Sequence, residues 1–476
     1  MGLIAKDARE RRAAAEALAK QNPEDMAAWM ALSRACQAVI DEEGAIVAAR
    51  RALEAQPENP EAIRQLASCL VQTGAGMPEA CTLFERLLVL VPGDAVALHY
   101  LHYYAICNGE YGRAIELSET LDRTHPGDPE TAGRIARAYK LNGEPLTAAE
   151  HFARAAARCD TEHYPFPFGP SAALKPIFTA LAGDFVRSER QSIEICQNAG
   201  RGLADLSNPR YPEHCVQLIG HIQDLVAGRD LFIFGMGPSL EEVVSRREDI
   251  ASMDFASMTL SSFSIIEDDV LRPIDRRLDF ACMTHPKVVE LQAPALREWL
   301  QSVPSSILIL PLIIREHAAI TGGPDFLLDH PQRLFWIDSF SEHLPPSPLD
   351  PLHLPAINTL ICALSVGILA RPRRIFLFGF DGQTQGSNIH GAHYYREGHY
   401  AYHTPHMDAE MRRIIRGRLW WDSTRFNEAA PIVVRHMSLL FDVPLPPIYN
   451  VFVDSALTPF PRIAFDRFQN ITKEDG

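Results

Sequence analysis

The chain has 476 residues, of which 47% are apolar and 22% are charged. It is therefore long enough to build two or three domains with buried cores, and it is neither disordered nor collagenous. Its 45 basic and 60 acidic side chains give a formal charge of −15, which repels a nucleic-acid backbone or an anionic membrane surface. This charge argues against both as general partners.

The cysteines and the apolar segments predict a cytoplasmic location. Nine cysteines are scattered along the chain without a CxxC pair, which is typical of buried thiols in a reducing compartment. The first residues, MGLIAKDARERR, contain no apolar signal core. The longest continuous apolar stretch, at 307–314, is too short to span a bilayer.

The first third of the chain is repetitive. Pro57, Pro92 and Pro126 follow one another at intervals of 35 and 34 residues, and each closes a helical pattern of alternating small and large residues. These patterns resemble the tetratricopeptide repeat, in which small residues let two antiparallel helices approach closely. We therefore predict a helical solenoid over residues 1–160, with the best match at 23–159 and a leading half repeat at 13–23.

A solenoid of about four such units usually forms a concave surface that holds a peptide, which predicts a protein partner. The alternative is a solenoid that packs only on its own catalytic domain or on a second copy of the chain.

Proline and aromatic residues end the repeat pattern. The segment EHYPFPFGPSAALKP places four prolines and three aromatic residues in 15 positions, which predicts a linker. Helical periodicity then returns without the repeat, so we interpret 161–228 as a linker with connecting helices.

The second half alternates apolar β-rich runs with helical stretches, which predicts a mostly parallel, Rossmann-like sheet covered on both faces. We place this α/β domain at 229–465, followed by a tail at 466–476. The predicted strands lie at 231–235, 255–261, 278–283, 306–314, 333–337, 374–380 and 448–453.

Small and polar residues follow three of these strands. The first strand ends in Gly235-Met236-Gly237-Pro238-Ser239, where two glycines let a ligand approach the backbone and Ser239 can cap the next helix, leaving N–H groups for a phosphate. This loop lacks the third glycine of the dinucleotide fingerprint and the P-loop lysine, so a tight turn without a ligand is the alternative. Asp381 follows another strand and Ser455 a third, which points to one crevice at the carboxyl ends of the strands.

The order FGMGPSL, INTLICALSVGILARPRRIFLFGFD and IYNVFVDSALTPFPRI resembles the bacterial motility accessory factor family of flagellin glycosyltransferases. It is similar, more distantly, to the family 42 sialyltransferases, and a pterin pyrophosphokinase family shares this domain. The resemblance covers roughly 229–465. It implies transfer of a sialic-acid-like nonulosonic acid from a CMP-linked donor to a protein Ser or Thr, with that sugar nucleotide as the donor substrate.

Individual positions follow from the resemblance. It implies that the loop residues Gly235, Gly237, Pro238 and Ser239 approach the donor nucleotide, that Asn358 and Thr359 lie near the cytidine and phosphate, and that Asp381 and Ser455 belong to the same site. Ser261 and His285 stand where those enzymes have asparagines facing the nucleotide or preceding a proline. Leu360 and Trp421 stand where they have a glycine and a histidine.

The missing histidine leaves the general base open. Between 388 and 406 the chain has five histidines and four tyrosines, including His393, Tyr394 and His399. A neutral imidazole can take the proton of an attacking hydroxyl, and a tyrosine can donate to a leaving phosphate. We therefore predict a catalytic or donor-binding loop with His393 or His399 as the base. A solvated loop and a divalent-metal site are the alternatives.

Two charged clusters have structural explanations as well as functional ones. One cluster has helical spacing and consists of Arg412, Arg413, Arg416 and Arg418. These cations could balance the phosphate and carboxylate of a sugar nucleotide, or they could form a solvated helix face. The acidic run Glu267-Asp268-Asp269 suggests metal binding only weakly, and we assign no metal ligands.

The sequence thus predicts a cytoplasmic glycosyltransferase whose solenoid holds a flagellin-like acceptor protein and whose α/β domain binds a nucleotide-activated sugar. Two alternatives stay open: a pterin pyrophosphokinase that uses ATP and Mg²⁺, and a non-catalytic tetratricopeptide scaffold.

Overall fold

The structure is a computed structural model that describes residues 2–39, 41–72, 76–159, 174–188, 190–191, 214–260, 263–284, 286–311, 330–337, 359–382, 423–424, 426–428, 430–431, 434–435, 438 and 443–473. The described residues fall into two compact units, the first ending at Cys159 and the second beginning at Leu174.

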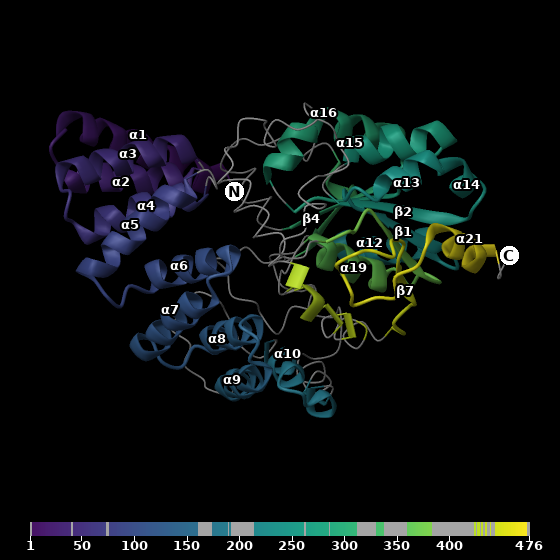
Figure 1. Ribbon diagram of the computed structural model, residues 1–476. Helices are drawn as coiled ribbons and strands as arrows, with labels where there is room; N and C mark the ends of the chain where they lie inside the picture. Colours follow the sequence, from purple (N-terminus) through teal and green to yellow (C-terminus); the bar gives the residue numbers. More distant parts are fainter. Residues whose placement is uncertain are drawn as a thin grey trace. The chain divides into compact units, whose positions relative to one another are not determined.

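The described part of the first unit is made of helices that follow one another in antiparallel pairs (Figure 1). Pairs of long helices follow a leading helix α1, and the first helices of successive pairs begin 34, 35 and 34 residues apart. This spacing is that of the predicted helix-pair solenoid, and α1 takes the place of the leading half repeat. The helices are α1 (Gly2–Gln21), α2 (Met26–Ala38), α3 (Glu42–Ala55), α4 (Pro60–Gln72), α5 (Met77–Leu90), α6 (Ala95–Asn108), α7 (Tyr111–Thr124), α8 (Pro129–Leu141) and α9 (Pro145–Arg158).

The same short motif starts the first helix of every pair. A proline opens the turn that precedes the helix, and an Asp or Asn two residues later accepts a hydrogen bond from a backbone N–H of the new helix. Asp25 accepts from Ala27 N at 2.9 Å and Asp94 accepts from Ala97 N at 2.9 Å. Such a cap stabilises a helix start by about 1 kcal/mol. Because the motif recurs before the first helix of each pair, its spacing matches the period of the repeat.

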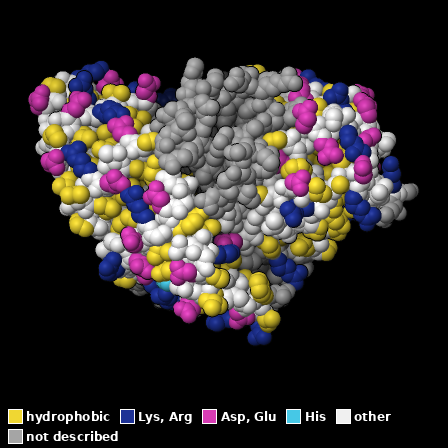
Figure 2. All heavy atoms as spheres, in the orientation of Figure 1, with side chains coloured by type: hydrophobic (Ala, Val, Ile, Leu, Met, Phe, Trp, Pro, Cys, Tyr) yellow, Lys and Arg dark blue, Asp and Glu magenta, His cyan; other side chains and the backbone are white. Residues whose placement is uncertain are grey.

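Packing and ion pairs join neighbouring repeats. Alanines such as Ala45 and Ala49 are fully buried, and Phe84 fills the space between helices. Arg50 bridges to Glu79 in the next repeat at 2.5 Å, and Arg113 bridges to Glu85. Figure 2 accordingly shows acidic and basic side chains intermingled on the visible surface of these helices.

The second unit contains a seven-stranded sheet in which all pairings are parallel. The strand order is β5-β4-β3-β2-β1-β6-β7. Each strand lies within one of the predicted runs or one residue from it: β1 (Asp230–Phe234), β2 (Phe255–Leu260), β3 (Phe280–Cys282), β4 (Ile307–Pro311), β5 (Leu334–Ile337), β6 (Ile375–Phe378) and β7 (Ile448–Asn450).

Helices cover both faces of this sheet (Figure 1). Gly367 in α19 lies against Leu231 and Ile375, so α19 covers the face to which the odd-numbered residues of β1 and β6 point. The helical elements of this unit are α10 (Leu174–Leu181), α12 (His214–Val226), α13 (Leu240–Ser245), α14 (Arg247–Ala251), α15 (Phe263–Ile265), the π-helix η3 (Ile266–Leu271), η4 (Arg272–Ile274), α16 (Pro286–Ser302), η5 (Pro331–Arg333), α19 (Thr359–Leu369) and α21 (Phe465–Lys473).

Aromatic side chains fill the core on the opposite face. Phe232 stacks on Phe255 with ring centroids 4.1 Å apart, and Phe376 and Phe468 meet edge to face at 4.9 Å. Phe468 belongs to α21 and is fully buried. The residues from 466 to 473, which we expected to be a tail, are therefore helical and pack on the sheet through Phe468.

Candidate functional site

The strand order reverses at β1, which lies between β2 and β6. Successive strands from β1 to β5 extend the sheet in one direction, and β6 and β7 extend it in the other. In parallel sheets the crevice outside the carboxyl ends of the strands at such a reversal is the usual place for a ligand. The loops after β1 and β6 meet at this point.

The backbone N–H groups of the loop after β1 donate to the chain itself. Gly235 N donates to Phe378 O and Gly237 N donates to Gly379 O, both at 2.7 Å. Ser239 N donates to Asp381 Oδ2 at 2.9 Å, and Leu240 N donates to Gly237 O at 3.0 Å. The loop is therefore fastened to the end of β6, and these donors do not point to an open cradle.

The predicted cap by the Ser239 side chain was wrong. Ser239 precedes α13 with a helical backbone (φ −61°, ψ −13°), so its hydroxyl does not reach the N–H groups of the first turn. Instead, the carboxylate of Asp381, distant in sequence, accepts from the N–H of Ser239 itself.

Glycines permit this close approach of the two strand ends. A Cβ on Gly237 would lie 2.0 Å from Asp381 Oδ2, and a Cβ on Gly235 would lie 2.7 Å from Gly379 O. Gly379 has a φ of +72°, in the left-handed region that favours glycine. The glycines of both loops therefore make room for Asp381 and for the backbone around it.

Asp381 places a buried carboxyl group at this corner of the site. Its side chain is buried, with 3% of the residue exposed, and it lies where the positive end of a helix would otherwise meet an anion. A phosphate placed about 4 Å from an ionised carboxylate is repelled by roughly 4 kcal/mol at the effective dielectric constant of a protein surface. A phosphate is therefore disfavoured at this corner when Asp381 is ionised.

Ser455 and Asn450 hold the backbone of Asp381. Ser455 Oγ lies 2.7 Å from Phe380 O and 3.1 Å from Asp381 O, and it accepts from Asn450 Nδ2 and from Leu457 N. A serine hydroxyl has one donor and two acceptor positions, so these contacts use all of them. Ser455, predicted to belong to the donor site, supports the loop after β6.

Hydroxyl groups are gathered at the carboxyl ends of the other strands. Thr284, after β3, lies with its Oγ1 2.6 Å from that of Thr359, at the start of α19. Ser239 Oγ and the Oγ1 of the fully buried Thr259, at the end of β2, have no hydrogen-bond partner among the described residues.

The structure thus brings several predicted residues together, namely Gly235, Gly237, Pro238, Ser239, Asp381 and Ser455. Thr359 lies at the same edge of the sheet. The other predicted residues, Ser261, His285, Asn358, His393, Tyr394 and His399, lie outside the described residues, as do Trp421 and the arginines at 412–418.

Asn450, Thr259 and Thr284 are polar residues at the strand ends around the candidate site that the sequence interpretation missed. Their signal is a polar residue within or directly after an otherwise apolar strand, in the segments IYN, SMTL and FACMT. A polar side chain in a strand covered on both faces needs a hydrogen-bond partner. Such a residue in an apolar run therefore indicates a polar environment at the end of the strand.

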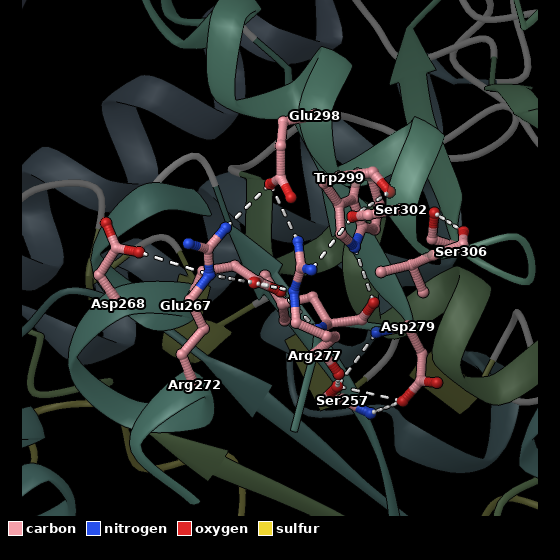
Figure 3. Close-up of polar contacts among 12 residues, drawn as sticks. Ser257, Glu267, Asp268, Arg272, Arg277, Asp279, Glu298, Trp299, Ser302 and Ser306 are labelled. Atoms are coloured by element: carbon pink, nitrogen blue, oxygen red, sulfur yellow. Dashed lines mark hydrogen bonds and ion pairs between the residues drawn. The ribbon is translucent and has the colours of Figure 1, made fainter. Parts of the chain in front are cut away.

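The acidic run that suggested a metal is part of an ion-pair network (Figure 3). Glu267 is buried and accepts from Arg277 Nε at 2.6 Å and from the backbone N–H of Leu278 at 2.6 Å. Arg272 and Arg277 both contact Glu298 on α16. The two arginines therefore link Glu267 in η3 to α16 through Glu298. In the described part of the chain no three His, Cys, Asp or Glu side chains gather as metal ligands would.

Arginines occupy the opposite edge of the sheet. Arg229 donates to Leu225 O at the end of α12, Arg333 donates to Ser306 O just beyond α16, and Arg374 donates to Ile471 O near the end of α21. Because the carbonyl ends of helices carry partial negative charge, guanidinium groups stabilise them. Burial lowers the pKa of Arg333 and, together with Arg229, that of Arg276. The charges of these arginines therefore serve the fold at the amino edge.

The described helices include none that is both long enough and apolar enough to cross a membrane. No family model and no curated protein matches the chain.

Solved structures of repeat proteins are similar to it. They include PilW, a type IV pilus biogenesis factor, which is 18% identical over 45% of this chain and 91% of its own, with a TM-score of 0.34. YrrB, a TPR protein with an unusual peptide-binding site, is 16% identical over 33% of this chain and 80% of its own, with a TM-score of 0.30. PilF of Pseudomonas aeruginosa is 15% identical over 40% of this chain and 85% of its own, with a TM-score of 0.33. At these low values nothing about ligands or activity follows from the likeness.

Proposed function

We propose that the helical-repeat unit binds a protein partner and that the α/β unit binds a nucleotide-activated sugar and transfers the sugar to that partner. The observation that carries the proposal is the meeting of the Gly235–Ser239 loop with Asp381 at the reversal of strand order. The carboxyl edge of a parallel sheet at such a reversal suits a nucleotide ligand, and a solenoid of helix pairs suits an extended protein ligand.

The resemblance of FGMGPSL and its companion motifs to the motility accessory factors supports a more specific form of this proposal. The donor is then a CMP-linked nonulosonic acid, and the acceptor is a Ser or Thr of a flagellin-like protein. Inverting transfer needs a base for the acceptor hydroxyl and donors for the leaving phosphate. We propose His393 or His399 as that base and Tyr394 as a donor-binding residue.

The second candidate is a non-catalytic scaffold, and a specific observation favours it. The N–H donors of Gly235, Gly237 and Ser239 and the hydroxyl of Ser455 are engaged within the chain. A degenerate domain that had kept only its packing would look the same at these positions. The pterin pyrophosphokinase, which needs ATP and Mg²⁺, has no residue in the described part of the chain that favours it.

Thermal unfolding of the full chain tests these proposals. A ligand that binds only the native state raises the unfolding midpoint by mass action. We expect CMP to raise it without a metal, whereas CDP, UDP, GDP, ATP and AMP serve as comparisons with and without Mg²⁺ or Mn²⁺. A shift with ATP or AMP plus Mg²⁺ alone would instead support the pyrophosphokinase, and no shift with any nucleotide would support the scaffold.

Single substitutions then test the base. His393→Ala and His399→Ala are each expected to leave the unfolding midpoint unchanged, and one of them is expected to abolish sugar transfer. Full transfer activity in both variants would contradict this assignment.

A further inference from the structure

One series of ion pairs runs through the helical-repeat unit from its first helix to its last. Each ion pair joins two successive members of the set formed by α1 and the second helices of the repeats, α3, α5, α7 and α9 (Figure 1). The paired residues are 29, 29, 28 and 36 positions apart in the sequence. The four pairs, which we call the ion-pair ladder, are Arg12–Asp41, Arg50–Glu79, Glu85–Arg113 and Asp122–Arg158, with Asp41 as the N-cap of α3.

Two of these ion pairs have the geometry of specific contacts. Arg50 donates to both carboxylate oxygens of Glu79, at 2.5 and 2.7 Å. Arg158 donates to both carboxylate oxygens of Asp122, at 2.5 and 3.0 Å. Such two-point pairing fixes the relative direction of the two side chains as well as their distance. Because the paired residues belong to different repeats, each contact also restricts how one repeat is rotated against the next.

The ion pairs act in series, because the middle helices take part twice through different residues. α5 contacts α3 through Glu79 and α7 through Glu85, and α7 contacts α5 through Arg113 and α9 through Asp122. In a solenoid each repeat contacts only its neighbours, and the curvature follows from the small rotation between successive repeats. Changes at the four pairs therefore add up between α1 and α9.

The ion-pair ladder lies where salt can reach it. The paired side chains are between 23% and 54% exposed. Ion pairs between such groups weaken as salt screens them, and they contribute little to the stability of the fold. The buried alanines and Phe84 that pack between the helices are apolar, so salt does not screen their contacts. Salt can therefore change the rotation between repeats while the helix pairs stay folded.

We propose that the ion-pair ladder is a conformational device that holds the solenoid at one curvature, and that this curvature changes when the pairs are screened or when one of them is removed. A partner that spans several repeats then meets a differently curved surface at low and at high salt. The inference goes beyond the proposed function and does not rest on it, because a sugar transferase and a scaffold would use the ladder in the same way.

Single-molecule energy transfer within the full chain tests the proposal. The two dyes are attached to p-acetylphenylalanine placed at Leu18 in α1 and at Leu146 in α9, which are 47% and 82% exposed. An increase from about 0.1 M to about 1 M NaCl shortens the Debye length from about 10 Å to about 3 Å. We expect this increase to shift the mean transfer efficiency of the labelled chain while its unfolding midpoint stays above the temperature of the measurement.

Substitutions then separate pairing from net charge. Arg50→Gln removes one pair of the ladder, so at 0.1 M NaCl it should shift the transfer efficiency in the direction that 1 M NaCl does without the substitution. Glu79→Gln should have the same effect, and the two substitutions together should shift it no further than either alone. Arg51→Gln is the matched control, because Arg51 pairs with Glu54 of its own helix at 2.9 Å, and this variant should keep the original value.

Three results would overturn the inference. They are a transfer efficiency that does not respond to salt, an Arg50→Gln variant that matches the unsubstituted chain at 0.1 M NaCl, and an Arg51→Gln variant that shifts as far as Arg50→Gln. In the last case net charge, rather than pairing between repeats, would set the distance. If Arg50→Gln does not fold, as judged by its unfolding midpoint, Glu79→Gln decides in its place. None of these results concerns nucleotide binding, which has its own test.

Discussion

Asp230 offers the sharpest test of how the α/β unit is held together. Its carboxylate is buried at the start of β1, with 2% of its side chain exposed, and it binds two adjacent arginines. Arg374 contacts it at 2.9 and 2.8 Å and is itself 7% exposed, whereas Arg373 is 35% exposed and contacts it at 3.0 and 3.1 Å. Asp230→Ala would take away the carboxylate that pairs with the buried Arg374, while the hydrogen bond from Arg374 to the carbonyl of Ile471 would remain.

Removal of one partner of a buried ion pair costs about 3–5 kcal/mol, because the other charge stays desolvated. For a unit of this size that corresponds to a fall of roughly 10 °C in the unfolding midpoint. Asp254→Ala is the matched control, because Asp254 pairs with Arg229 at the same edge of the sheet at 2.9 Å but is 77% exposed. An exposed pair contributes about 0–1 kcal/mol.

Urea unfolding followed by tryptophan fluorescence measures both variants, since Trp299 is fully buried in this unit. The reasoning fails if Asp230→Ala is no less stable than Asp254→Ala. In that case the two arginines are solvated after the substitution, and the RPRR segment before β6 would have to serve another purpose.

Three further outcomes are expected. Phe84→Ala should destabilise the repeat unit by about 3–5 kcal/mol because its ring is fully buried, whereas Val89→Ala, at 81% exposure, should change little; denaturation of both variants compares them. Burial is the main cause, and the charge of Arg154 the second, of a lowered pKa of His151 in the folded protein. As the pH falls below 6.5, the unfolded state therefore binds more protons at this residue than the folded state does. The repeat unit should therefore lose stability as the pH falls through that range, and His151→Gln should flatten the dependence measured by thermal unfolding. Burial raises the pKa of Cys81 and Cys362 to about 12, so both thiols should resist labelling at pH 8 until the chain is unfolded; rapid labelling of the native protein would contradict this.

The regular elements were predictable because each depends on local patterns. The helix pairs follow from prolines placed two residues before Asp25, Asn59, Asp94 and Asp128, and the strands follow from short apolar runs. The boundary at 465 was less accurate, because Phe468 is buried only through contacts with strands distant in sequence. Periodicity within a nine-residue helix cannot reveal such contacts.

The location of the candidate site was predictable from the sequence, but the hydrogen bonds within it were not. The residues Gly235–Ser239 and Asp381 are correctly brought together by the rule that strand ends meet at one edge. What the sequence did not reveal is the direction of the hydrogen bond between them, since Ser239 and Asp381 are 142 residues apart. The sequence shows the same glycine whether the space beside it is filled by a ligand phosphate or by a carboxyl group of the chain itself.

The distribution of charge around the sheet explains why this difference matters for function. The helices that cover a parallel sheet run against its strands, so their carbonyl ends collect at the amino edge, where Arg229, Arg333 and Arg374 accompany them. Their N–H ends collect at the carboxyl edge, where a ligand would normally supply the negative charge. In this chain a carboxyl oxygen of Asp381 accepts from the N–H of Ser239 at the central position. The N–H of Ser239, which a ligand phosphate would otherwise engage at such a helix start, is therefore already used by a carboxyl group of the chain itself.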